Sequence, residues 1–567
     1  MRLRDLGSIG WVAVAACGAP SVDVTSPPAA TRVELTPVEH LNRASMVLRG
    51  VRPSVAELEA VQADPSALPG FVDVYLHDPR FGDTVRDLHN DAWSMRATGE
   101  INVPATGSLA DVEMTRLRVS LYEGPLRTIQ HVVENDLPYT EILAADYQLG
   151  DEVVSRAFTQ LTGYDDAVGG WQVLHWTDDR PAAGILSDNM LYVRFGSMGS
   201  NFNRGRANHV SRALLCHDYL DREITLDGSI DLSDPAVVAD AVTQSEACAT
   251  CHRTLDPLAS FFSWRTGFAL RVQVWPTQLY MPQYTESEAW WDTTGQPPAY
   301  YGAPGRDMGD LARFIREDDR FSLCTARRFY GWMTETPLTH VPEEAANELQ
   351  DVLVGSGWNA RALARAVVLH PDFRIASSTD PVEADGVVGL QRARPEQLTR
   401  LIEDLTGFVW QTYGEEECCL GDGVSPIGLV HVPTDAWTGF QTLLGGIDGA
   451  FVSQPVYTAN ATTTLALREF AGEAAGWVVP RDLDQPDRAQ RKLLGLVERD
   501  TTDRDAIVTQ LVALHARIFA EFVGPDDPSV VAAWELWADV HGRTADPEHA
   551  WKATVAAMLQ DWRILYY

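Results

Sequence analysis

The chain has 567 residues, is 45% apolar and 22% charged, and carries a formal net charge of −34. These proportions are ordinary for a globular protein, and the length predicts about three or four domains. The strong negative charge argues against nucleic-acid binding, which requires a positive surface, and against unassisted adsorption to anionic lipid.

The N-terminus has the pattern of a bacterial export signal. Two arginines and a short apolar run precede Cys17, and this run is too short to span a bilayer. The Val-Ala-Ala before Cys17 resembles a lipobox, whose cysteine is lipidated; an ordinary signal peptide with an incidental cysteine is the alternative. We expect a lipoprotein-type signal over 1–17, a tether over 18–35, and an exported outer-membrane lipoprotein that faces the periplasm or the surface. A lipid anchor would be its one attachment to the membrane.

Helical spacing of apolar residues dominates the rest of the chain. It recurs over 36–62, 109–134, 204–220, 308–333, 341–370, 396–412, 462–477, 504–522 and 547–560. Strand-like alternation is sparse and short. The sequence therefore predicts a mainly α protein built from several helical bundles.

Cys248, Cys251 and His252 form a C-x-x-C-H motif, the attachment signature of c-type haem. The two thiols can each bond a vinyl group of the porphyrin, and the histidine then becomes the proximal iron ligand. A disulfide loop and half of a zinc site are the alternatives, but the sequence lacks the second ligand pair that a zinc site needs. We expect one covalent haem c per chain, in a cytochrome c-like segment embedded in the helical bundles. We also expect Pro257 to end the local helix or set a corner.

The sixth iron ligand decides the chemistry of such a haem. Methionine gives an electron-transfer haem of raised potential, histidine lowers the potential, and an open position permits peroxide or small-gas chemistry. The distal candidates are Met281, Met308 and Met198, followed by His209 and His217. Three arginines upstream can pair with haem propionates, although a helix-start cluster without that role explains them as well: Arg204, Arg206 and Arg212.

Four further cysteines fit an oxidising compartment, because an even number is compatible with two disulfides. Cys216 and Cys324 bracket the motif, which favours that pair. Cys418 and Cys419 are adjacent, and they can form a strained vicinal disulfide or remain two buried thiols.

Two parts of the chain begin and end alike. TPVEHLNRASMVLRG and RPEQLTRLIEDLTG each read as an amphipathic helix ended by glycine, and the later segments DFRI and DWRI also match. We interpret them as two modules, the second a degenerate, haem-free repeat of the first, although helical proteins often share such patterns. The expected division is a helical domain, the haem-bearing helical domain, a linker and the haem-free domain: 36–185, 186–375, 376–393 and 394–567.

The segments GILSDNMLYVRFGSMGSNFNRGRANHVSRALLC and CATCHRTLDPLA resemble a family of large secreted proteins, best known from planctomycete-type genomes. Its members consist of serial domains of unknown function around one C-x-x-C-H motif. The resemblance covers most of 36–375 and, more faintly, 394–567. It implies haem c and secretion but no substrate. In one departure, Ala259 and Ser260 stand where the family often has Gly-Phe.

These patterns predict a monohaem c-type cytochrome of the bacterial cell envelope that exchanges electrons with an unidentified partner protein. One alternative is a peroxidase or oxidase-type haem enzyme with an open distal site. The other is a surface binding or structural lipoprotein in which the haem is secondary.

Overall fold

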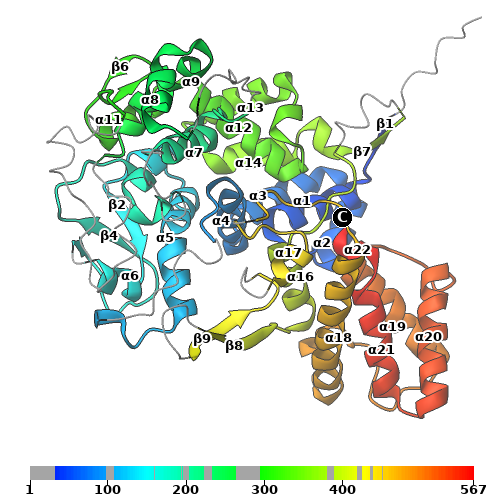
Figure 1. Cartoon of the computed structure of the whole chain (residues 1–567). Coiled ribbons are helices and arrows are strands. Elements are labelled where there is room, and N and C mark those ends of the chain that lie inside the picture. The colour runs from blue at the N-terminus through cyan, green and yellow to red at the C-terminus, as the bar shows by residue number, and fades with distance from the viewer. Residues whose placement is uncertain are drawn as a thin grey trace, which may run out of the picture.

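The computed structural model (Figure 1) describes residues 32–96, 107–158, 160–192, 195, 203–221, 231, 233–263, 294–379, 388–417, 424–434, 439–449 and 451–567. The protein is mainly α, as predicted, and its sheets are small. Several residues singled out in the sequence lie outside the described residues: Cys17, Met198, Met281, Cys418 and Cys419.

The first module, residues 36–375, contains most of the helices. They are α1 (Pro37–Arg49), α2 (Val55–Ala63), α3 (Leu68–Leu76), α4 (Pro79–Trp93), α5 (Met114–Glu134), α6 (Glu152–Ala157), α7 (Arg204–Leu215), α8 (Pro235–Gln244), α9 (Glu246–Ser260), α11 (Met308–Arg316), α12 (Asp319–Thr334), α13 (Glu343–Gly355) and α14 (Ala360–Val368). The short strands are β1 (Arg32–Glu34), β2 (Tyr147–Gly150), β3 (Leu161–Thr162), β4 (Gln172–Trp176), β5 (Ala299–Tyr300), β6 (Ala303–Pro304) and β7 (Ile375–Ser378). They form the antiparallel sheets β1-β7, β2-β4-β3 and β5-β6.

The second module, residues 394–567, adds a smaller set of elements. Its helices are α16 (Pro395–Thr406), α17 (Phe440–Leu443), α18 (Ala461–Asp484), α19 (Arg504–Leu514), α20 (Pro528–Thr544), α21 (Pro547–Leu559) and α22 (Trp562–Leu565), and its hairpin is β8 (Gln411–Glu417) with β9 (Val424–His431). Figure 1 shows α18–α21 as a bundle at one end of the molecule, while α7–α9 and α11 gather at the opposite end. The buried apolar side chains of both modules nevertheless form one continuous cluster.

Both modules begin with the helix that the repeated sequence predicts. α1 and α16 each start on a proline and end at a glycine in the left-handed region, with φ of 70° at Gly50 and 71° at Gly407. Only glycine adopts this conformation without strain, so both helices stop where predicted. A Cβ at Gly50 would lie 2.7 Å from Arg400 Nε, so the end of α1 also contacts α16.

In each module, residues just before the first helix pair with residues at the module's end. β1, which precedes the first module, pairs with β7, which begins at its last residue. In the second, Gln391 and Tyr567 exchange backbone hydrogen bonds of 3.1 and 3.0 Å, and Ala393 N–H donates to the Leu565 carbonyl. Residues 376–378 and 391–393 lie within the expected linker, and both take part in these pairings.

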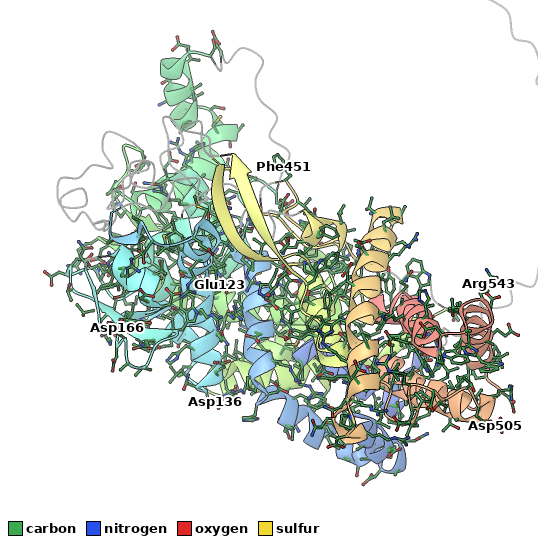
Figure 2. All side chains as sticks on the ribbon, turned by 90° about the horizontal axis from the view of Figure 1, so that it is seen from below. Glu123, Asp136, Asp166, Phe451, Asp505 and Arg543 are labelled. Carbon is green, nitrogen blue, oxygen red and sulfur yellow. A yellow bond between two sulfur atoms is a disulfide. The ribbon has the colours of Figure 1, made fainter. Side chains whose placement is uncertain are left out.

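A buried network of ion pairs, which we call the interface network, joins the two modules. Glu123 on α5 accepts from Arg86 and Arg96, both at 2.5 Å, and it lies in the interior of the molecule (Figure 2). Burial alone would raise the pKa of Glu123, but the two guanidinium groups hold it well below its usual range. Asp87 on α4 links Arg96 to Arg400 of the second module, at 2.7 Å from each.

We expect Glu123→Gln to destabilise the protein by about 3–5 kcal/mol, because it removes the buried charge that two buried guanidinium groups share. Asp83→Asn is the matched control, since Asp83 also pairs with Arg86 but its side chain is 37% exposed, and its loss should cost under about 1 kcal/mol. Urea unfolding followed by circular dichroism measures both. Equal losses in the two variants would contradict the role given to Glu123.

Candidate haem-binding site

Helix α9 presents the three residues of the C-x-x-C-H motif on one face. Cys248, Cys251 and His252 stand at positions i, i+3 and i+4 of this helix, which lie on the same side of an α-helix. Cys251 is 7% exposed, and Cys248 and His252 are half-buried. Two thiols and an imidazole on one face can approach a single porphyrin.

The expectation that Pro257 ends the local helix is wrong, because α9 continues through it to Ser260. Proline removes one helical hydrogen bond, here the bond to the carbonyl of Arg253. Arg253 is exposed, so water can reach this turn of the helix. Leu258 and Ala259 beyond the proline are 2% and 0% exposed, and their burial favours continuing the helix over a corner.

The imidazole of His252 is oriented by a carboxylate one helical turn later. Its Nδ1 lies 2.9 Å from Asp256 Oδ1. Burial alone would raise the pKa of Asp256, but His252 and Arg204 hold it below its usual value, so the group is ionised at neutral pH. An ionised carboxylate only accepts hydrogen bonds, so Nδ1 carries the proton and Nε2 of the neutral ring keeps its lone pair.

Arg204, the first residue of α7, holds the same carboxylate with two hydrogen bonds. Its Nε lies 2.6 Å from Asp256 Oδ1 and its Nη2 2.9 Å from Oδ2. Bidentate pairs of this kind fix both position and orientation. A second polar contact comes from Tyr219, whose hydroxyl donates to Thr254 Oγ1 at 3.1 Å. Helix α7 and the turn that follows it therefore both contact α9 just after the motif, at Asp256 and Thr254.

The other two arginines predicted for haem propionates have partners away from the motif. Arg206 is buried and donates to the Phe195 carbonyl and to Asn203 Oδ1, both at 2.7 Å, and burial lowers its pKa to about 10. Arg212 is partly exposed and lies 4.0 Å from Asp218. Of the three, Arg204 is the one that contacts the helix of the motif, through Asp256.

The candidate distal ligands that the structure describes are spread over different surroundings. Met308 begins α11 and is 2% exposed in the core. His209 is buried with its ring stacked on Phe195 at 3.7 Å, and His217 is exposed. None of these contacts identifies a sixth ligand, which stays a prediction.

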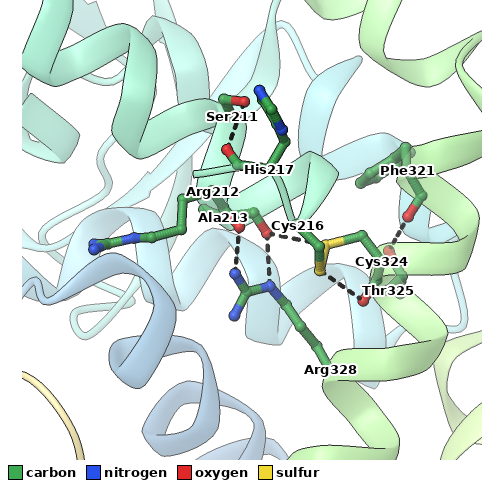
Figure 3. Close-up of a disulfide and its surroundings, with 9 residues drawn as sticks. All are labelled: Ser211, Arg212, Ala213, Cys216, His217, Phe321, Cys324, Thr325 and Arg328. Atoms are coloured by element: carbon green, nitrogen blue, oxygen red, sulfur yellow. Dashed lines mark hydrogen bonds between the residues drawn. A yellow bond between two sulfur atoms is a disulfide. The ribbon is translucent and has the colours of Figure 1, made fainter. Parts of the chain in front are cut away.

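A disulfide joins Cys216 to Cys324, the pair favoured by the sequence (Figure 3). Cys216 ends α7 with φ of 51°, and Cys324 lies inside α12. Arg328, one turn further along α12, donates to the Ala213 carbonyl at 2.8 Å. These contacts attach the C-terminal end of α7 to α12, while Arg204 at its other end holds Asp256.

Replacing both bridge cysteines, Cys216→Ala with Cys324→Ala, should lower the free energy of unfolding by about 2–5 kcal/mol, because the bridge closes a long loop in the unfolded chain. Thermal unfolding with and without a thiol reductant measures the effect. Reductant should lower the midpoint of the wild-type protein and leave that of the double variant unchanged. A reductant effect of equal size in both proteins would show that this bridge is not responsible.

Among the described residues, no group of three or more His, Cys, Asp and Glu side chains is arranged to hold a metal ion. No helix in the same part of the chain is long and apolar enough to cross a membrane. The comparisons with protein-family models, with curated proteins and with solved structures found no match to this chain. The family resemblance therefore rests on the residues quoted above and stays a prediction.

Proposed function

We propose that this protein is a monohaem c-type cytochrome of the bacterial cell envelope. The observation that carries the proposal is the face of α9, where two cysteines stand beside a histidine whose Nδ1 is held by Asp256. Cys248 and Cys251 would form the thioethers, and His252 Nε2 would bind the iron. When bound, the haem supplies one-electron chemistry at a potential that its surroundings set.

The donor set fits haem better than a bare metal ion. A structural zinc ion is held by about four protein ligands, and the described residues contain no cluster of even three. Haem brings four nitrogen ligands of its own, so the chain needs to supply one imidazole and two thiols. The residues on α9 meet this requirement.

The remaining features of the proposal follow from the sequence. Covalent haem attachment takes place outside the cytoplasm, and a signal ending at Cys17 would export the chain and anchor it by lipid, in the outer membrane. The partner would be an unidentified redox protein that docks on the other domains of the chain. A net charge of −34 favours a partner with a basic surface, because opposite charges speed association.

The histidine test compares His252→Ala with His549→Ala, an exposed histidine of the second module, after expression in a periplasm with haem-attachment machinery. His252→Ala should lose the low-spin haem spectrum because it removes the proximal ligand, whereas His549→Ala should match the wild type. A pyridine haemochrome spectrum of the denatured proteins reports covalent haem c. Undiminished low-spin haem in His252→Ala would overturn the ligand assignment.

A haem enzyme of the peroxidase or oxidase type is the second candidate, and the contact between Asp256 and His252 favours it. A carboxylate on the proximal imidazole makes that ligand a stronger donor, and a stronger proximal donor favours cleavage of the O–O bond of peroxide. The two candidates differ in whether the distal position is filled.

The spin state of the ferric protein distinguishes these candidates. We expect a six-coordinate low-spin spectrum, because a methionine or histidine side chain fills the distal position in an electron-transfer haem; methionine is the ligand we test first. Single replacements of Met308, Met281 and Met198 by alanine should then identify one residue whose loss gives a high-spin spectrum, with the other two as matched controls. A high-spin wild-type protein that consumes peroxide would favour the enzyme instead.

A further inference from the structure

We infer that Asp256 and Arg204 set the reduction potential of the haem in opposite directions. The inference rests on the function proposed above and adds to it the residues that tune the iron. Both are positioning residues, since each would act on the iron through His252.

Asp256 contacts the proximal imidazole and changes its strength as an iron ligand. The carboxylate of Asp256 is 4% exposed, so its charge is poorly screened by water and acts strongly on its neighbours. A negative oxygen 2.9 Å from Nδ1 draws the N–H proton toward itself and makes Nε2 a stronger donor. Ferric iron carries one more positive charge than ferrous iron, so a stronger donor favours the ferric state and lowers the potential.

Arg204 acts on the same oxygen of Asp256. Arg204 Nε lies 2.6 Å from Asp256 Oδ1, the atom that also accepts from His252. The guanidinium therefore competes with the imidazole for the charge of this oxygen and weakens the hydrogen bond to Nδ1. Its own positive charge also disfavours ferric iron. Both effects raise the potential, against the effect of Asp256.

The Asp256 carboxylate and the Arg204 guanidinium both occupy fixed positions. Asp256 is inside α9, and Arg204 begins α7, whose far end is attached to α12 by the disulfide. The carboxylate is held by one bond from its own helix and two from the neighbouring helix. Such a carboxylate cannot rotate away from the imidazole without breaking a bidentate ion pair.

The test is the midpoint potential of the haem-loaded protein, measured by spectroelectrochemistry at neutral pH. Asp256→Asn keeps an acceptor but removes the charge, and it should raise the ratio of ferrous to ferric haem at a fixed potential about tenfold, or about 59 mV for one electron. Arg204→Met should lower this ratio, and Arg204→Lys should restore most of it. Arg543→Met, at a side chain of the second module that is 76% exposed, makes the same change in net charge away from Asp256 and should leave the ratio near that of the wild type.

A double variant separates tuning from a general structural effect. When Asp256 is already Asn, the further change Arg204→Met should lower the ratio by less than it does in the wild type, because part of its effect passes through the carboxylate. Shifts of the same sign in the two single variants, or no shift, with haem c attached would overturn the inference. If Asp256→Asn does not fold, the comparison of Arg204→Met with the control Arg543→Met decides the inference alone. Absence of covalent haem from the wild type would instead overturn the proposed function.

Discussion

Glu123 lies between Arg86 and Arg96 in the interior of the molecule, and Asp87 connects this group to Arg400 of the second module. An uncompensated charge at this depth costs several kcal/mol, so each member depends on the others remaining in place. The two modules can pack as one continuous core only if the charges between them are paired. The interface network is therefore the constraint on which the relative position of the modules depends.

The candidate site also contains a buried carboxylate whose charge is balanced by an arginine. Asp256 is buried beside the motif, and its charge is balanced by Arg204 from a neighbouring helix. This ion pair connects α7 to α9. The same carboxylate also fixes the orientation of His252. The disulfide at the other end of α7 keeps the helix that supplies the arginine against α12. Paired charges and one covalent bridge thus add to the apolar packing that holds α9 in place.

The sequence predicted features that depend on neighbouring residues. The glycine stops at Gly50 and Gly407 were predicted because a left-handed residue has a local signature. Helix α4 was not predicted, since it buries polar residues such as Asp87 and Asn90 on faces where apolar ones are expected. The bond from Arg400 to Asp87 joins residues 313 positions apart, and no local pattern indicates it. The sequence placed a helix end or a corner at Pro257, because a local pattern gives no information on the tertiary packing that favours a continuous helix there.

The same distinction holds within the site. The C-x-x-C-H motif can be recognised from the spacing of its residues alone, whereas the roles of Asp256 and Arg204 depend on how two helices pack. The i, i+4 spacing of His252 and Asp256 is the signal that was available in the sequence. Nothing in the sequence indicated that Arg204, 52 positions earlier, holds the same carboxylate.

The most direct test of the account is peptide mass spectrometry of the protein produced with haem-attachment machinery. The account predicts that the peptide containing Cys248 and Cys251 carries the mass of one haem, bound through both cysteines, and that this mass survives denaturation. A peptide with two unmodified thiols, or with an internal disulfide, would contradict the assignment of α9 as the haem-binding helix.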